Sequence, residues 1–118
     1  MQFYFSETAK KRDDAKNFCI SEGGKLFEPR DAKTSKIVTD YAKSAGVVYF
    51  WIGIQYKPDD KSYVYISDNT PVTWTNWANG QPDRNGNCVA RGWGKNDTWD
   101  DRPCNLKNPF VCFRFKEG

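Results

Sequence analysis

The four cysteines constrain the fold of this chain more than any other feature. They stand at Cys19, Cys88, Cys104 and Cys112, with no Cys-x-x-Cys pair and no histidine in the chain to complete a zinc site. Two disulfides are the better interpretation, and four cysteines allow three connectivities. The spacing favours a long bridge from Cys19 to Cys112 that encloses a short bridge from Cys88 to Cys104. Because disulfides form in oxidising compartments, we expect a secreted, extracellular protein.

Length and composition predict one folded domain over residues 1–118. A chain of 118 residues can bury one hydrophobic core, and an aromatic content of 16% is too high for a disordered segment. No run of 18 apolar residues occurs, so we expect no membrane insertion. The net charge of +3 is modest, and we expect no nucleic-acid binding. The absence of histidine removes the commonest general acid or base, which argues against an enzyme.

The hydrophobic pattern predicts helices early in the chain and strands later. An aromatic strand over 2–5 precedes a helix that carries Ala15, Phe18 and Cys19 on one face and stops at Gly23-Gly24. A second helix should run from Thr34 or Ser35 to Gly46 and bury Ile37, Val38, Tyr41, Ala42 and Ala45. Short aromatic or β-branched segments predict strands at 50–55, 62–67, 72–75, 87–93, 98–101 and 110–115. Helices followed by strands indicate an α+β fold with antiparallel sheet.

A polar, turn-rich segment over 75–87 is typical of a functional loop. It contains Gln81-Pro82-Asp83, and Asp100 and Asp101 follow about eighteen residues later on a predicted strand. If Cys88 pairs with Cys104, the bridge holds the strand after the loop beside the strand that bears the two aspartates. Amide and carboxylate oxygens from both segments would then converge. Such oxygens suit Ca²⁺, which accepts six to eight oxygen ligands in flexible geometry.

Several spaced motifs together resemble a C-type lectin-like domain of the short form over nearly the full length. The matching features are Ala15 with Cys19, Gly23-Gly24-Lys25-Leu26, Trp51-Ile52-Gly53, Trp77, Gln81-Pro82-Asp83, Cys88, Trp99-Asp100-Asp101, Cys104 and Phe110-Val111-Cys112. The resemblance implies two helices flanking antiparallel sheets, a long calcium-binding loop region, and disulfides Cys19–Cys112 and Cys88–Cys104. It leans toward tetranectin and the C-terminal lectin domains of proteoglycans.

The Gln-Pro-Asp motif carries the resemblance further, to a sugar type. It implies galactose or N-acetylgalactosamine, a cis peptide bond before Pro82, and coordination of vicinal sugar hydroxyls to Ca²⁺. Gln81 would donate hydrogen bonds to the sugar and Asp83 would accept them. The expected partners are glycans that end in these sugars. Because a site of this kind binds a single sugar weakly, we also expect a homo-oligomer.

Two departures from the family pattern affect the site. The glutamate that usually precedes the equivalent of Cys88 is missing, and Asp100 stands where the family has an asparagine. We interpret this as an exchange of acid and amide, with Asn87 or Asn85 supplying the lost amide. The predicted metal ligands are Gln81, Asp83, Asn87, Asp100 and Asp101, and the predicted sugar contacts are Gln81, Asp83, Asp100, Asn85 and Trp93.

Two other functional classes compete with the lectin. A protein-binding, matrix-, mineral- or ice-associated domain of the same fold would carry the sugar motif as a relic. A glycosidase built on Asp83 with Asp100 or Asp101 would need two acids held about 5 to 9.5 Å apart with one pKa raised. Carboxylates that cluster around one cation fit that arrangement poorly. The triplet Asn96-Asp97-Thr98 is a glycosylation sequon, which agrees weakly with secretion.

Overall fold

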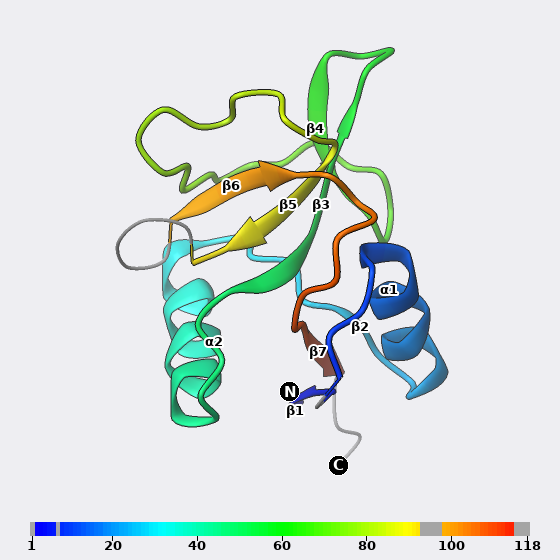
Figure 1. Ribbon diagram of the computed structural model, residues 1–118, viewed down its shortest axis with the longest axis vertical. Coiled ribbons are helices and arrows are strands. Elements are labelled where there is room, and N and C mark those ends of the chain that lie inside the picture. The colour runs from blue at the N-terminus through cyan, green and yellow to red at the C-terminus, as the bar shows by residue number, and fades with distance from the viewer. Residues whose placement is uncertain (1, 7, 93–97, 115–118) are drawn as a thin grey trace.

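A computed structural model shows an α+β fold of two helices and antiparallel sheets, and it describes residues 2–6, 8–92 and 98–114 (Figure 1). Among the described residues the helices are α1 (Arg12–Ser21) and α2 (Ala32–Ser44). The strands are β1 (Gln2–Phe5), β2 (Lys25–Leu26), β3 (Phe50–Lys57), β4 (Ser62–Tyr65), β5 (Cys88–Arg91), β6 (Trp99–Arg102) and β7 (Val111–Arg114). The predicted fold class is therefore confirmed.

Local sequence explains where the second helix begins. The side chain of Asp31 accepts a hydrogen bond of 2.7 Å from the backbone N–H of Thr34, so α2 starts at Ala32 and not at Thr34 or Ser35. Gly46, with φ of +79°, ends the helix as expected. The predicted buried face is only partly right. Val38 and Ala42 are buried, whereas Ile37 is 47% exposed and Ala45 is exposed.

The strands form two antiparallel sheets. One sheet has the order β1-β7-β2, and the other has the order β4-β3-β5-β6. The segment 72–75 was predicted as a strand but is irregular in the structure, and it touches the sheet through the Val72 N–H bond to the Tyr63 carbonyl oxygen. Its proline neighbour Pro71 makes only an isolated bridge to Val64. The aromatic and β-branched composition of 72–75 therefore serves packing and not a sheet ladder.

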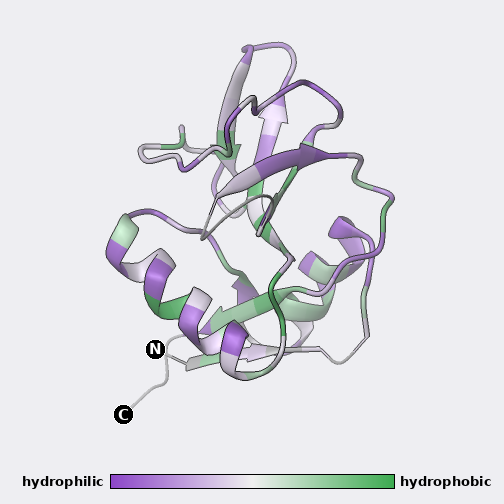
Figure 2. Cartoon of the chain, turned by 60° about the vertical axis from the view of Figure 1, so that its left-hand side comes forward, coloured by the Kyte–Doolittle hydropathy of each residue, from purple (hydrophilic) through white to green (hydrophobic). Residues whose placement is uncertain are grey.

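Two disulfides connect these layers with the predicted pairing. Cys19 on α1 bonds to Cys112 on β7, and Cys88 on β5 bonds to Cys104 in the segment after β6. The bridges belong to one buried cluster that includes the fully buried Trp51, whereas Trp99 belongs to the other cluster of the core. Figure 2 shows the hydrophobic stretches mainly on strands, while the helices and the long loops are largely hydrophilic or neutral. The short bridge thus fixes the chain on both sides of the β5–β6 pair.

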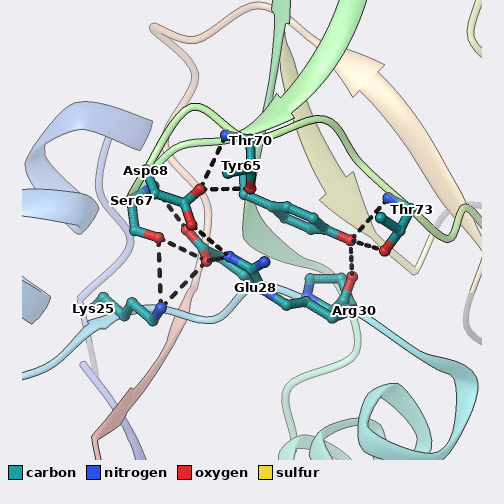
Figure 3. A network of polar contacts seen from close by, with 9 residues as sticks. Lys25, Glu28, Arg30, Tyr65, Ser67, Asp68, Thr70 and Thr73 are labelled. Atoms are coloured by element: carbon teal, nitrogen blue, oxygen red, sulfur yellow. Dashed lines mark hydrogen bonds and ion pairs between the residues drawn. The ribbon is translucent and has the colours of Figure 1, made fainter.

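A polar network joins the segment between β2 and α2 to the turn after β4 (Figure 3). The buried carboxylate of Glu28 accepts hydrogen bonds from the N–H and the hydroxyl of Ser67, at 2.8 and 2.9 Å. Arg30 and Lys25 form ion pairs with Glu28 at 2.9 and 3.4 Å. Buried charges need partners of this kind, so the network fixes the relative positions of these two segments.

Candidate functional site

The long loop lies alongside β6 and brings its polar residues to that strand. The N–H of Trp99 donates to the carbonyl of Asn76, and the N–H of Ala78 donates to the carbonyl of Trp99, both at 2.8 Å. Further along, the N–H of Asp83 donates to Oδ1 of Asp101 at 3.0 Å. On the other side of β6, Val89 pairs with Asp101 in the β5–β6 ladder. The loop and the strand therefore converge as the sequence predicted.

The Gln81-Pro82-Asp83 motif forms a compact turn with the expected cis bond between Gln81 and Pro82. The Asp83 carboxylate accepts a hydrogen bond from the Asn85 N–H at 3.0 Å and one from the Gln81 amide at 3.4 Å. The pKa of Asp83 lies below its usual value. The largest cause is a hydrogen bond with the Asp101 carboxyl group; burial opposes it with a smaller effect, and the bonds from Asn85 and Gln81 lower the pKa further. Asp83 thus meets Asp101 through its backbone N–H, while its carboxylate is held by Gln81 and Asn85.

Two oxygen atoms at this point are buried without a hydrogen-bond donor: Oε1 of Gln81 and Oδ2 of Asp101. Both atoms can only accept, and an acceptor left without a partner in the interior costs free energy. Together with the Asp83 carboxylate they form a set of hard oxygens, and no cation within 2–6, 8–92 and 98–114 forms an ion pair with Asp83 or Asp101. The chemistry of this set fits Ca²⁺, and we call Gln81, Asp83 and Asp101 the oxygen cluster.

Asp100 does not lie with the oxygen cluster, which corrects the prediction that it replaces the missing glutamate. Successive strand residues face opposite sides, so Asp100 points away from Asp101. Its carboxylate accepts hydrogen bonds of 2.8 and 3.1 Å from the Tyr49 hydroxyl, and it is 2% exposed. Burial raises the pKa of Asp100, against the opposing effects of the Tyr49 bond and of Arg102. Asp100 is therefore a buried partner of Tyr49.

Asn87 is already engaged by an arginine that the sequence did not mark as functional. Nη2 of Arg84 donates to Oδ1 of Asn87 at 3.1 Å, and Nη1 donates to the Tyr63 hydroxyl at 3.1 Å. The Arg84 guanidinium carbon lies 3.3 Å from the centre of the Tyr56 ring. The Asn87 carbonyl oxygen thus has a donor beside it, and the structure does not place it with the oxygen cluster.

The remaining predicted contacts are placed as follows. Asn85 is exposed beside Asp83, and its backbone N–H is the group that meets the Asp83 carboxylate. Trp93 and Asn96 lie outside the described residues. Within 2–6, 8–92 and 98–114, no group of three or more His, Cys, Asp or Glu side chains could hold a metal ion. The predicted set of three carboxylates is therefore reduced at this site to Asp83 and Asp101.

Sequence reasoning missed Arg84, Tyr49 and Tyr63. Arg84 follows Gln81-Pro82-Asp83 directly, but nothing in its spacing shows that its guanidinium stacks on a ring some thirty residues earlier. Tyr49 precedes a strand and was not singled out. The alternation of Asp100 and Asp101 along β6 was the one available signal, because it places adjacent side chains on opposite faces.

The family assignment rests on a match that covers most of the chain. Residues 8–114 match the family model described as the Lectin C-type domain. The chain belongs to the C-type lectin domain family. Among curated relatives of this C-type lectin domain, Collectin-10 of Xenopus tropicalis is 32% identical over 114 residues, which are 93% of this chain and 40% of the relative. The tetranectin-like protein of Carcharhinus perezii is 29% identical over 111 residues, 91% of this chain and 66% of the relative.

Solved structures with the same fold include a carbohydrate-recognition domain and a Ca²⁺-independent lectin. The mouse scavenger receptor C-type lectin carbohydrate-recognition domain has a TM-score of 0.84 and 26% identity, covering 98% of this C-type lectin domain and 89% of that chain. The Ca²⁺-independent C-type lectin SPL-2 from Saxidomus purpuratus has a TM-score of 0.80 and 25% identity, covering 93% and 83%. Within the described residues, no helix has the length and apolar character to cross a membrane.

Proposed function

We propose that this C-type lectin domain is a non-enzymatic, calcium-dependent carbohydrate-binding domain of the galactose and N-acetylgalactosamine type. The observation that carries the proposal is the pair of donor-less buried oxygens, Oε1 of Gln81 and Oδ2 of Asp101, beside the Asp83 carboxylate. These three side chains would hold the ion. When bound, calcium supplies a centre at which two neighbouring sugar hydroxyls replace water.

The residues of the oxygen cluster have distinct roles toward the sugar. The Gln81 amide NH₂ donates to a sugar hydroxyl, and the Asp83 carboxylate accepts from one. That order of donor and acceptor is the one that the Gln-Pro-Asp motif implies for galactose. Asn85, exposed beside Asp83, and Trp93, outside the described residues, are retained in the proposal as further sugar contacts. The hydrogen-bond order within the cluster therefore underlies the proposed specificity.

The disulfides and the relatives support an extracellular, secreted setting for this domain. Two disulfides connect the described residues, and no free cysteine occurs among them. The partners would be glycans that end in galactose or N-acetylgalactosamine. Since a site that grips two hydroxyls binds a single sugar at roughly millimolar strength, we propose that useful binding requires several copies of the domain in one assembly.

A specific observation favours a second candidate, a calcium-independent member of the family. Asp83 and Asp101 are the two charged members of the oxygen cluster, and the Arg84 guanidinium donates a hydrogen bond of 3.1 Å to the side-chain oxygen of Asn87. Fewer carboxylates weaken calcium binding, because ligand charge is one determinant of affinity. In this second candidate the loop would be ordered by Arg84, and the domain would bind protein or another surface.

Thermal unfolding with and without calcium separates the two candidates. Ligand binding to the folded state alone raises Tm with the logarithm of the ligand concentration above Kd, so millimolar calcium should raise Tm and EDTA should reverse it. Calcium-dependent retention on a galactose resin should accompany the shift. Asp83→Asn and Asp101→Asn should each abolish both effects.

Asp100→Asn is the matched control, because it removes the neighbouring carboxylate of the same strand on the opposite face. It should leave the calcium-induced rise in Tm intact. A Tm that ignores both calcium and EDTA in the parent protein would instead favour the calcium-independent candidate. Loss of the calcium effect in Asp100→Asn but not in Asp101→Asn would place the ion elsewhere.

A further inference from the structure

A groove runs between helix α1 and the strands β3 and β4, well away from the oxygen cluster. It consists of two hollows of about 250 Å³ each, which share Lys16 and Ile66 as lining residues. One hollow extends to Lys25 and Leu26 on β2, and the other extends to Arg12 and Lys57. In Figure 1 α1 lies at the lower right, whereas the long loop after β4 extends to the upper left. We call this feature the α1 groove, and it shares no lining residue with the oxygen cluster.

The α1 groove is lined by four basic side chains: Arg12, Lys16, Lys25 and Lys57. No acidic side chain appears among its described lining residues. Two of the cations are already paired, since Arg12 lies 2.9 Å from Asp13 and Lys25 lies 3.4 Å from Glu28. Lys16 and Lys57 make no ion pair with any described residue. The groove therefore keeps a positive excess that an anionic ligand would neutralise.

Arg12 contributes its positive charge to the groove from a buried position. The residue is only 5% exposed, and Nη1 of its guanidinium is buried without a hydrogen-bond partner. The other guanidinium nitrogens are used: Nε and Nη2 donate to Asp13, and Nη2 also donates to Gln55 at 2.5 Å. Because Nη1 has almost no solvent-accessible surface, a ligand in the groove does not touch it, and Arg12 acts on such a ligand through its positive charge.

The apolar residues that line the groove, and the spread of its cations, suit a chain of sugar rings more than a single ion. Leu26, Val64 and Ile66 supply apolar lining between the charges. At one end Lys25 is held toward the Ser67 hydroxyl at 3.5 Å and toward Glu28, as Figure 3 shows. Cations are therefore distributed along the groove, on α1, β2 and β3. Repeated anionic groups on one ligand can meet several of them at once, which a lone anion cannot do.

We propose that the α1 groove binds a sulfated glycan chain, at a site separate from the oxygen cluster and independent of calcium. Sulfate esters supply the acceptors for Lys16 and Lys57, the buried charge of Arg12 adds to the attraction, and the sugar rings lie over the apolar floor. The two disulfides place the domain in an oxidising, extracellular compartment, where sulfated polysaccharides are available and nucleic acids are not the expected polyanion.

Titration calorimetry with a heparin octasaccharide, in EDTA and at low salt, tests the proposal. The parent protein should bind the octasaccharide, and its desulfated form should not bind. The double variant Lys16→Gln with Lys57→Gln should weaken binding about tenfold, because it removes both unpaired cations from the groove. The matched control is Lys33→Gln with Lys43→Gln, which removes the same charge from exposed positions on α2. The control should bind within about twofold of the parent.

Three results would overturn the proposal. Equal weakening in the two double variants would mean that net charge alone attracts the polymer and that the groove is not the site. Equal binding of the desulfated octasaccharide would remove the role of the sulfate groups. Equal binding of a poly-glutamate peptide of the same charge would replace the sulfated glycan by an acidic protein segment. Because EDTA is present throughout, none of these results depends on the proposed calcium site.

Discussion

Two adjacent aspartates on β6 have different surroundings because a strand turns successive side chains to opposite faces. Oδ1 of Asp101 accepts the Asp83 N–H, and its Oδ2 has no donor. Asp100 is buried under the Tyr49 hydroxyl. One residue of displacement thus separates a candidate metal ligand from a buried structural carboxylate. At the residue scale, the identity of a side chain says less about its role than the face of the strand on which it stands.

The pKa of Asp100 leads to a prediction about stability and pH. Burial raises the folded pKa of Asp100 above its ordinary value near 4. The folded state therefore binds the proton of this carboxyl group more strongly than the unfolded state does. At neutral pH the ionised Asp100 lowers the free energy of unfolding. This destabilisation disappears as the pH falls through the folded pKa and Asp100 becomes protonated. Asp100→Asn keeps an oxygen for Tyr49 without the charge. It should be as stable as the parent or more stable at pH 7, and lose that advantage below about pH 4.

Urea unfolding at pH 7, 5 and 3 measures this difference. Asp40→Asn, at an exposed position of α2, serves as a control for the general loss of one negative charge. If Asp100→Asn is clearly less stable than the parent at pH 7, the ionised carboxylate stabilises the folded state. Our inference that burial of this charge lowers stability would then be wrong.

At the element scale, the close approach of the long loop to β6 depends on a glycine. A Cβ at Gly86 would lie 2.1 Å from the backbone carbon and 2.2 Å from the carbonyl oxygen of Arg102. Backbone atoms cannot yield to such an overlap as a flexible side chain can. Gly86 therefore lets the end of the loop pack against the end of β6, two residues before Cys88, which pairs with Arg102 in the β5–β6 ladder. The same approach brings Asp83 to Asp101.

Gly86→Ala should displace the loop and disturb the oxygen cluster. We expect a loss of about 1 to 3 kcal/mol in the free energy of unfolding, as for other overpacked sites. We also expect the calcium-induced rise in Tm to disappear, because Asp83 would move away from Asp101. Calorimetric unfolding with calcium and with EDTA measures both effects. Asn79→Ala changes an exposed residue of the same loop and should behave as the parent; a Gly86→Ala protein with parental stability and calcium response would contradict this account.

For the whole molecule, the two disulfides stabilise different parts of the fold. The Cys19–Cys112 bridge spans 93 residues and ties α1 to β7, whereas the Cys88–Cys104 bridge spans 16 residues and closes the β5–β6 region. Both bridges lie in one of the two buried clusters of the core, with Ala15 of α1 and with Trp51 and Ala90 of the β4-β3-β5-β6 sheet. The short bridge is therefore the one whose removal should affect the site more than the fold.

Removing the short bridge in the double variant Cys88→Ala with Cys104→Ala should cost about 3 kcal/mol of stability, from the loop that it closes. The Cys19–Cys112 bridge should still form, so the secondary structure seen by far-UV circular dichroism should be retained. Calcium response should fall sharply, because the loop is no longer fixed against β6. Loss of all cooperative unfolding in this variant would show that the fold also depends on the short bridge. A full calcium response would show that the short bridge does not fix the loop against β6.

The sequence by itself determined the fold class, the disulfide pairing expected from the family motifs, the cis bond at Pro82 and the convergence of the loop with β6. These features follow from spacing and local chemistry along the chain, such as cysteine positions, glycine stops and the Gln-Pro-Asp motif. Helix α2 began two residues before the predicted start, since the cap is made by the Asp31 side chain. The strand predicted at 72–75 was wrong, because its side chains pack without joining a ladder.

Only the tertiary structure decided which of the predicted ligands meet. The exclusion of Asp100, the pairing of Asn87 with Arg84 and the donor-less oxygens of Gln81 and Asp101 depend on contacts between residues far apart in the chain. A list of oxygen-bearing residues fixes the chemistry that is available, whereas burial and strand orientation fix which atoms share one space. That is why the sequence could lead us to expect a calcium-type site here, while the folded chain shows that, of the expected ligands, Gln81, Asp83 and Asp101 are the ones that remain for the site we propose.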